Sequence, residues 1–177
     1  YTANHHNYVD GRLTYFDVCV KDCGDAAKAD WRTLLIGGLG SGGRGYYALD
    51  ITDPAAPKAL WEFTHADLGY TYGEPQIGKL KNGTWVVMFA SGYNNVDGVD
   101  GVSGGSGVGK LFVLNAVTGA QITGSPISTG VGSATDPSGL AQITAPSSDP
   151  MQDPVVLGVY GGDLLGNLWR FDLNDEV

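Results

Sequence analysis

One strand pattern occurs three times in this 177-residue sequence, and its recurrence limits the folds that the chain can adopt. Each copy is a short apolar segment that ends in an acidic or amide residue, at Asp50, Asn115 and Asp172. A leucine or phenylalanine comes directly before that residue, and an aromatic residue lies three positions before it. The copies are 65 and 57 residues apart, and each follows another apolar strand pattern. Repeats of this size, rich in short strands, are typical of β-propeller blades.

Each copy is the third strand of a predicted four-strand unit. The predicted strands cover residues 11–18, 31–37, 46–52 and 58–64, then 73–80, 84–91, 110–116 and 121–127, then 139–145, 155–161 and 167–173. The continuous apolar run at 31–37 indicates burial on both faces, and residues 146–154 read as a loop. Strand-borne aromatic side chains are expected in the core between sheets. We therefore predict an all-β fold, a partial β-propeller of the quinoprotein-like type with about three four-stranded antiparallel blades.

The predicted blades cover about residues 9–66, 70–130 and 138–177, all within one propeller domain, and the last blade lacks its outer strand. Propellers usually have four to eight blades, and an incomplete ring leaves open sheet edges. The sequence also starts at Tyr1 rather than at an initiator methionine. We therefore expect this chain to be a piece of a longer protein, with the remaining propeller segments as its partners.

Charge and composition exclude several classes of function. The formal net charge of −9 disfavours nucleic acid and anionic membrane surfaces. The longest apolar runs, such as residues 85–90, are too short for a transmembrane segment. Ser41 lies among glycines but lacks the spacing of a nucleophile elbow, and no other pattern indicates a catalytic site, so we expect a protein that is not an enzyme.

The two cysteines, Cys19 and Cys23, are separated by three residues. Two thiols without nearby histidines make a poor zinc site, because structural zinc needs four ligands. A local disulfide in an exported protein is the favoured interpretation, and free thiols are the alternative.

Five segments in a fixed order resemble a known family. They are GGLGSGGRGYYALDITDP, KALWEF, YGEPQIGKL, FASGYNN and YGGDLLGNLWRFDL. In this order they are similar to the C-terminal propeller of the PilY/PilC proteins, the type IV pilus biogenesis factors and tip-associated adhesins of Gram-negative bacteria. The resemblance runs over nearly the whole chain.

The resemblance implies a non-enzymatic module that supports pilus assembly and surface attachment. The implied partners are minor pilins or the pilus tip and a host or abiotic surface. The implied location is the cell surface, the pilus tip or the outer membrane of an exported protein. Family members can also carry a calcium loop between the second and third strands of a blade, which links calcium binding to pilus extension and retraction.

Residues 94–109 form the one strongly expanded turn of this type, and they are the candidate calcium loop. Asn94, Asn95, Asp97 and Asp100 supply side-chain oxygens, and glycine allows the backbone to wrap around an ion. Position 99 is a valine and no bidentate glutamate follows, so the set departs from a full alternating calcium loop. The alternative is a Gly/Ser-rich surface loop with turn-forming Asp-Gly pairs.

Two other functions remain open. The repeat at 109–119 also occurs in quinoprotein propellers, so a fragment of a quinoprotein-type dehydrogenase is the enzymatic alternative, although no quinone-binding set is present. The second of these functions is that of a structural scaffold that docks pilins.

Overall fold

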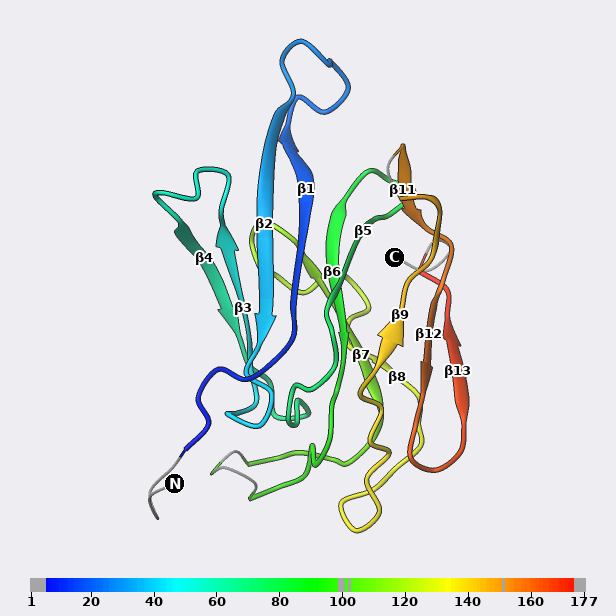
Figure 1. Cartoon of the computed structure of the whole chain (residues 1–177). Coiled ribbons are helices and arrows are strands. Elements are labelled where there is room, and N and C mark those ends of the chain that lie inside the picture. Colours follow the sequence, from blue (N-terminus) through cyan, green and yellow to red (C-terminus); the bar gives the residue numbers. More distant parts are fainter. Residues whose placement is uncertain (1–5, 99–100, 102, 151, 174–177) are drawn as a thin grey trace.

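The computed structural model describes residues 6–98, 101, 103–150 and 152–173 (Figure 1). Across these ranges the chain is all-β, with three sheets stacked side by side, which confirms the predicted partial β-propeller. The exact blade limits stay a prediction. No helix in the described part of the chain is long and apolar enough to cross a membrane.

The first sheet is a four-stranded antiparallel meander in the order β1-β2-β3-β4. Its strands are β1 (Leu13–Lys21), β2 (Asp30–Gly38), β3 (Tyr46–Asp50) and β4 (Lys58–Phe63). Leu34 of β2 pairs with Phe16 of β1 and with Asp50 of β3, so the repeated strand ending lies beside the buried centre of β2. This sheet matches the predicted first unit.

The second sheet has six strands in the order β10-β11-β5-β6-β7-β8. They are β5 (Gln76–Lys79), β6 (Trp85–Ala90), β7 (Lys110–Asn115), β8 (Ile127–Ser128), β10 (Ser147–Asp149) and β11 (Asp153–Val156). The predicted strand at 121–127 is mostly wrong, because only its last residue belongs to β8. Pro126 cannot donate to a ladder, and Gln121 makes only an isolated bridge to Leu114.

The β10–β11 hairpin is a feature that the sequence patterns miss. β11 lies parallel to β5 with Val155 opposite Lys79, which makes the second sheet mixed. The predicted single strand at 155–161 is therefore wrong, because the chain changes sheets after Val156. Leu157 is exposed at this change of direction. The predicted loop at 146–154 is likewise wrong, since it contains β10 and the start of β11.

The third sheet contains three described strands in the order β13-β12-β9. They are β9 (Ile143–Thr144), β12 (Val159–Gly162) and β13 (Leu168–Phe171). β9 is much shorter than the predicted strand at 139–145. No fourth strand follows β13 within the described residues, which end at Leu173.

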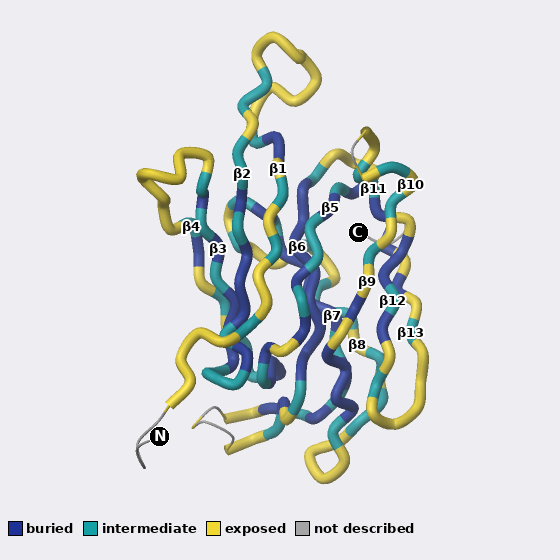
Figure 2. Tube along the Cα trace, in the orientation of Figure 1, coloured by how far each residue is buried: buried dark blue, intermediate teal, exposed yellow. Residues whose placement is uncertain are grey.

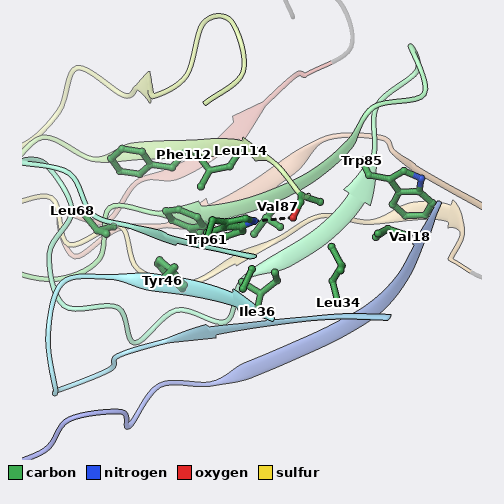
Figure 3. Close-up of a cluster of buried hydrophobic side chains, with 13 residues drawn as sticks. Val18, Leu34, Ile36, Tyr46, Trp61, Leu68, Trp85, Val87, Phe112 and Leu114 are labelled. Carbon is green, nitrogen blue, oxygen red and sulfur yellow. Dashed lines mark hydrogen bonds between the residues drawn. The ribbon is translucent and has the colours of Figure 1, made fainter. Parts of the chain in front are cut away.

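The hydrophobic core consists of two clusters, one on each face of the second sheet. All six residues of β6 are buried, and neighbouring residues point to opposite faces, as strand geometry requires. Phe89 packs toward the first sheet in one cluster, whereas Met88 packs toward the third sheet in the other. Figure 3 shows the first cluster, with Ile36 and Tyr46 from the first sheet opposite Val87 and Phe112 from the second. The second sheet is thus the central layer of the described fold.

The outer sheets each contain exposed residues (Figure 2), and some of these are apolar. Trp31 is 52% exposed, which corrects the prediction that residues 31–37 are buried on both faces. Among the described elements, the first sheet has a neighbouring sheet on one side only. Leu34 and Ile36 on that side are buried, while Leu13 and Tyr15 on the other face are exposed. On the third sheet, Leu168 is 79% exposed.

Candidate functional site

The candidate loop at 94–109 connects β6 to β7. It is closed near its base by a bridge between Val96 and Ser106 and by a hydrogen bond from Gly107 N to Asn95 O at 2.9 Å. Positive φ angles at Gly98, Gly104 and Gly107 let the backbone turn sharply there. The loop base is therefore an ordered extension of the β6–β7 hairpin.

The four predicted calcium donors do not share one environment. Asn94 is exposed and has a positive φ of 55°, whereas Asn95 is fully buried. Asp97 is exposed, and its Oδ1 accepts a hydrogen bond from Gly104 N at 2.8 Å across the loop. Asp100 lies outside the described residues. The three donors that the structure describes therefore differ in burial and in hydrogen-bond partners.

Asn95 is the buried anchor of the loop. Its Nδ2 donates to the carbonyl oxygens of Val108, at 2.9 Å, and of Asp67, at 3.2 Å. Its Oδ1 is buried and has no hydrogen-bond partner, so among the predicted donors that the structure describes it is the one with a spare buried oxygen. In the described part of the chain, no group of three or more His, Cys, Asp or Glu side chains could hold a metal ion. Asparagine side chains are not among these four residue types, so calcium binding at this loop stays a prediction.

An ion pair that the sequence analysis missed lies under the loop. The Asp67 carboxylate contacts Lys110 Nζ, and it accepts hydrogen bonds from Ser106 N at 2.8 Å and Ser106 Oγ at 2.5 Å. Burial raises the pKa of the Asp67 carboxyl, but the hydrogen bonds from Lys110 and Ser106 outweigh burial and hold that pKa below its usual value. Asp67 therefore stays ionised and serves as a structural acceptor.

Arg44 fixes the same region from the first sheet. Its side chain is buried, and its guanidinium donates to the carbonyl oxygens of Leu68, Ala66 (2.8 Å) and Val96 (3.3 Å). Arg44 and Asp67 together tie the connection between the first two sheets to the base of the loop. In the sequence, charge is the feature that marks Arg44 and Asp67, because charged residues make up just 16% of the chain. Their mutual placement depends on tertiary structure.

The predicted cysteine pair lies at the junction of β1 with the β1–β2 loop, with Cys19 in β1 and Cys23 in the loop. The structure contains a disulfide between Cys19 and Cys23, with the Cα atoms 5.7 Å apart. Cys19 is buried, whereas residues 21–28 are exposed and project beyond the end of the sheet (Figure 2). The disulfide therefore ties the first residues of a protruding, polar loop to the end of β1.

The chain matches known proteins over nearly its whole length. The family model of the PilY1 beta-propeller domain matches residues 1–177. The chain belongs to this family. A PilY1 homolog of Xylella fastidiosa, named as a type IV pilus biogenesis factor, is 36% identical over 97% of this chain. The type IV pilus biogenesis factor PilY1 of Pseudomonas aeruginosa is 38% identical over 96% of it.

The solved structures give the same result for the fold. The crystal structure of the Pseudomonas aeruginosa PilY1 C-terminal domain has a TM-score of 0.67 and 37% sequence identity over 94% of this chain. The chain spans 30% of that solved chain. It spans 11% of the Xylella fastidiosa relative and 13% of the Pseudomonas aeruginosa relative. The match therefore concerns one propeller segment of much longer relatives.

Proposed function

We propose that this chain is a non-enzymatic propeller module of a type IV pilus biogenesis factor, which supports pilus assembly and surface attachment. The observation that carries the proposal is the match of the PilY1 propeller family to all 177 residues. The charged side chains inside the fold support a structural role. Arg44 donates to backbone carbonyl oxygens, and Asp67 accepts hydrogen bonds from Ser106 and contacts Lys110.

The proposed partners begin with the remaining propeller segments of the parent protein. Exposed apolar residues of a kind that flanking blades would cover include Leu13 and Tyr15 on the first sheet, Leu168 on the third, and Leu164 in the turn between β12 and β13. Beyond the parent protein, we propose minor pilins or the pilus tip and a host or abiotic surface as partners. The proposed location is the cell surface, the pilus tip or the outer membrane.

Deletion in the parent protein tests this function. We expect a parent protein without this segment, produced at the normal level, to give fewer surface pili and weaker attachment. The control strain produces the parent protein with Asp53→Asn, a substitution at an exposed residue. Its number of surface pili and its attachment should both be unchanged. Normal piliation and attachment in the deletion strain would contradict the proposal. Pull-down with minor pilins then separates a scaffold role from attachment, because a scaffold would keep pilin binding when surface attachment is lost.

Calcium regulation is the second part of the proposal. The buried, unpartnered Oδ1 of Asn95 and the exposed carboxylate of Asp97 support calcium binding by the loop at 94–109. We expect calorimetric titration with calcium to give heat of binding in the unmodified chain and none in the Asp97→Ala/Asp100→Ala double variant. Equal heats in both proteins would remove the loop as the site.

The enzymatic alternative is not favoured. The relatives reported above are named as pilus biogenesis factors, and none is named as a quinoprotein dehydrogenase. Reconstitution with a quinone separates the two functions, because a dehydrogenase would gain quinone absorbance and dye-linked turnover. We expect neither signal.

A further inference from the structure

A turn at residues 65–68 follows β4 and contacts the base of the candidate loop at 94–109. Leu68 N donates to His65 O at 2.9 Å, which closes the turn. Asp67 N donates to Nδ1 of the His65 imidazole at 3.0 Å, so this side chain is an acceptor for the backbone of its own turn. His65 therefore helps to fix the position of Asp67.

The same turn is bonded to the first sheet and to the loop. Arg44, between β2 and β3, donates to the carbonyl oxygens of residues 66 and 68. From the loop, Asn95 Nδ2 donates to Asp67 O at 3.2 Å, and Ser106 N donates to Asp67 Oδ1 at 2.8 Å. A displacement of this turn would therefore loosen the loop base and its connection to the first sheet together.

Two aromatic rings pack against the half-buried imidazole of His65. The ring of Phe63, in β4, is nearly parallel to it, with the centroids 6.5 Å apart. The ring of Phe112, in β7, meets it edge to face at 5.2 Å. These contacts restrict the imidazole and keep Nδ1 directed at the Asp67 N–H.

The elements packed against the imidazole carry charges of both signs. They are Asp67 of the same turn, Arg44 between β2 and β3, Glu62 on β4, Asp97 in the loop and Lys110 on β7. Asp67 and Lys110 pair with each other, and Glu62 points to the other face of β4 from the aromatic residue that follows it. Within the described contacts, none of these side chains bonds to the imidazole. The bond at Nδ1 is therefore the contact that depends directly on the protonation state of His65.

We propose that His65 is an acid-sensitive latch, which holds the turn at 65–68 closed while its imidazole is neutral and releases the base of the loop when the imidazole binds a proton. A neutral imidazole has one accepting and one donating nitrogen, whereas both nitrogens of the protonated ring donate. Protonation would set Nδ1–H against the Asp67 N–H, so the charged ring and the closed turn exclude each other. Because imidazoles titrate between about pH 5 and 8, the latch opens as pH falls through that range.

Hydrogen exchange of the full-length parent protein, read by mass spectrometry, tests the latch with all flanking segments in place. Protection factors, which are corrected for the effect of pH on intrinsic exchange, are compared at about pH 7.5 and 5.5. No calcium is added, so the result is independent of the proposed calcium site. We expect protection to fall about tenfold in peptides that cover residues 66–69 and 104–108, and less than about twofold in β12 and β13. Unchanged protection in the first two segments overturns the proposal.

Two substitutions of His65 give a matched pair. His65→Asn keeps an acceptor that does not titrate, because an asparagine side-chain oxygen can bond to the N–H two residues later in an Asx turn. This variant should keep its protection at the lower pH. His65→Ala removes the acceptor and should give low protection at both pH values. A pH dependence that persists in His65→Asn, or full protection in His65→Ala at the higher pH, overturns the proposal.

Discussion

The indole Nε1 of Trp61 donates a hydrogen bond to the carbonyl oxygen of Ala116 at 2.9 Å, from the last strand of the first sheet to the turn after β7 (Figure 3). Gly119 lies against the same indole, and a Cβ built there would come within 2.6 Å of Trp61 Cγ. Its φ of 70° also favours glycine. The Val-Thr-Gly turn therefore serves as a contact between sheets as well as a chain reversal.

Trp61→Phe should destabilise the fold by about 1–3 kcal/mol, because the substitution leaves the Ala116 carbonyl buried without its donor. Urea unfolding measures the change in the free energy of unfolding. Tyr8→Phe, at an exposed position, is the control and should change stability by less than about 0.5 kcal/mol. Equal effects of the two substitutions would show that the hydrogen bond contributes nothing measurable.

Asp67→Asn should lower the free energy of unfolding by about 2 kcal/mol at neutral pH, because it removes the charge opposite Lys110 in a mostly buried pair. The folded-state pKa of Asp67 is lowered, so its stabilisation is complete above the unfolded value of about 3.9 and is lost as pH falls through the folded pKa. The stability difference between the unmodified chain and Asp67→Asn should therefore be constant near neutral pH and shrink below about pH 4.

Urea unfolding across this pH range checks the prediction for Asp67. Asp53→Asn is the control, because Asp53 is exposed and its carboxylate accepts only the Ala55 N–H within the described contacts. A difference between Asp67→Asn and the unmodified chain that stays constant down to about pH 2 would contradict the role given to Asp67.

Asp163→Ala should loosen the turn between β12 and β13. The Asp163 carboxylate accepts hydrogen bonds from Asn167 N at 2.8 Å, Leu165 N at 3.1 Å and Trp169 Nε1 at 2.9 Å. We expect a loss of about 2–3 kcal/mol in the free energy of unfolding and faster exchange of the Trp169 indole proton. Trp169→Phe removes one donor only and should cost about 1 kcal/mol. An indole proton that exchanges equally fast in Asp163→Ala and the unmodified chain would count against this arrangement.

Phe89→Ala and Met88→Ala should weaken different interfaces although the residues are neighbours in β6. Both should destabilise the fold, by about 3–5 and 2–5 kcal/mol respectively, because each leaves a cavity in a close-packed cluster. Amide exchange should accelerate mainly in β1–β4 for Phe89→Ala, and mainly in β9, β12 and β13 for Met88→Ala. The same exchange pattern in both variants would contradict the division of the core into two clusters.

The order of the strands within each repeat was predictable, because it follows from apolar segments and turn residues that are close together in the sequence. The strand endings at Asp50 and Asn115 form Asx turns, with Asp50 Oδ1 accepting from Thr52 N at 2.9 Å and Asn115 Oδ1 from Val117 N at 3.0 Å. The pairing of β11 with β5 was not predictable, because residues 147–153 are mainly polar and show no alternation. Their strand character comes from the partner that the fold places beside them.

The candidate loop shows the same limit. The repeat predicted the position of the loop between β6 and β7. It did not predict that Asn95 is buried while Asn94 is exposed, because Asn95 bonds to the carbonyl oxygens of Asp67 and Val108, which belong to no local sequence pattern. The pairing of Asp67 with Lys110 spans 43 residues, and a single sequence contains no signal for such a contact. The nearest indication of this pair in the sequence was the presence of charged residues next to strands that were predicted to be buried.

The pairing of β11 with β5 also sets an order of events during synthesis. The edge of β5 at Lys79 becomes covered only when Val155 has left the ribosome, 76 residues later. Until then the second sheet presents an open edge, at a stage when other unfolded chains are close by. Chaperones that shield this edge, or slow release of the nascent chain, would therefore have their largest effect on yield in the interval between these two segments.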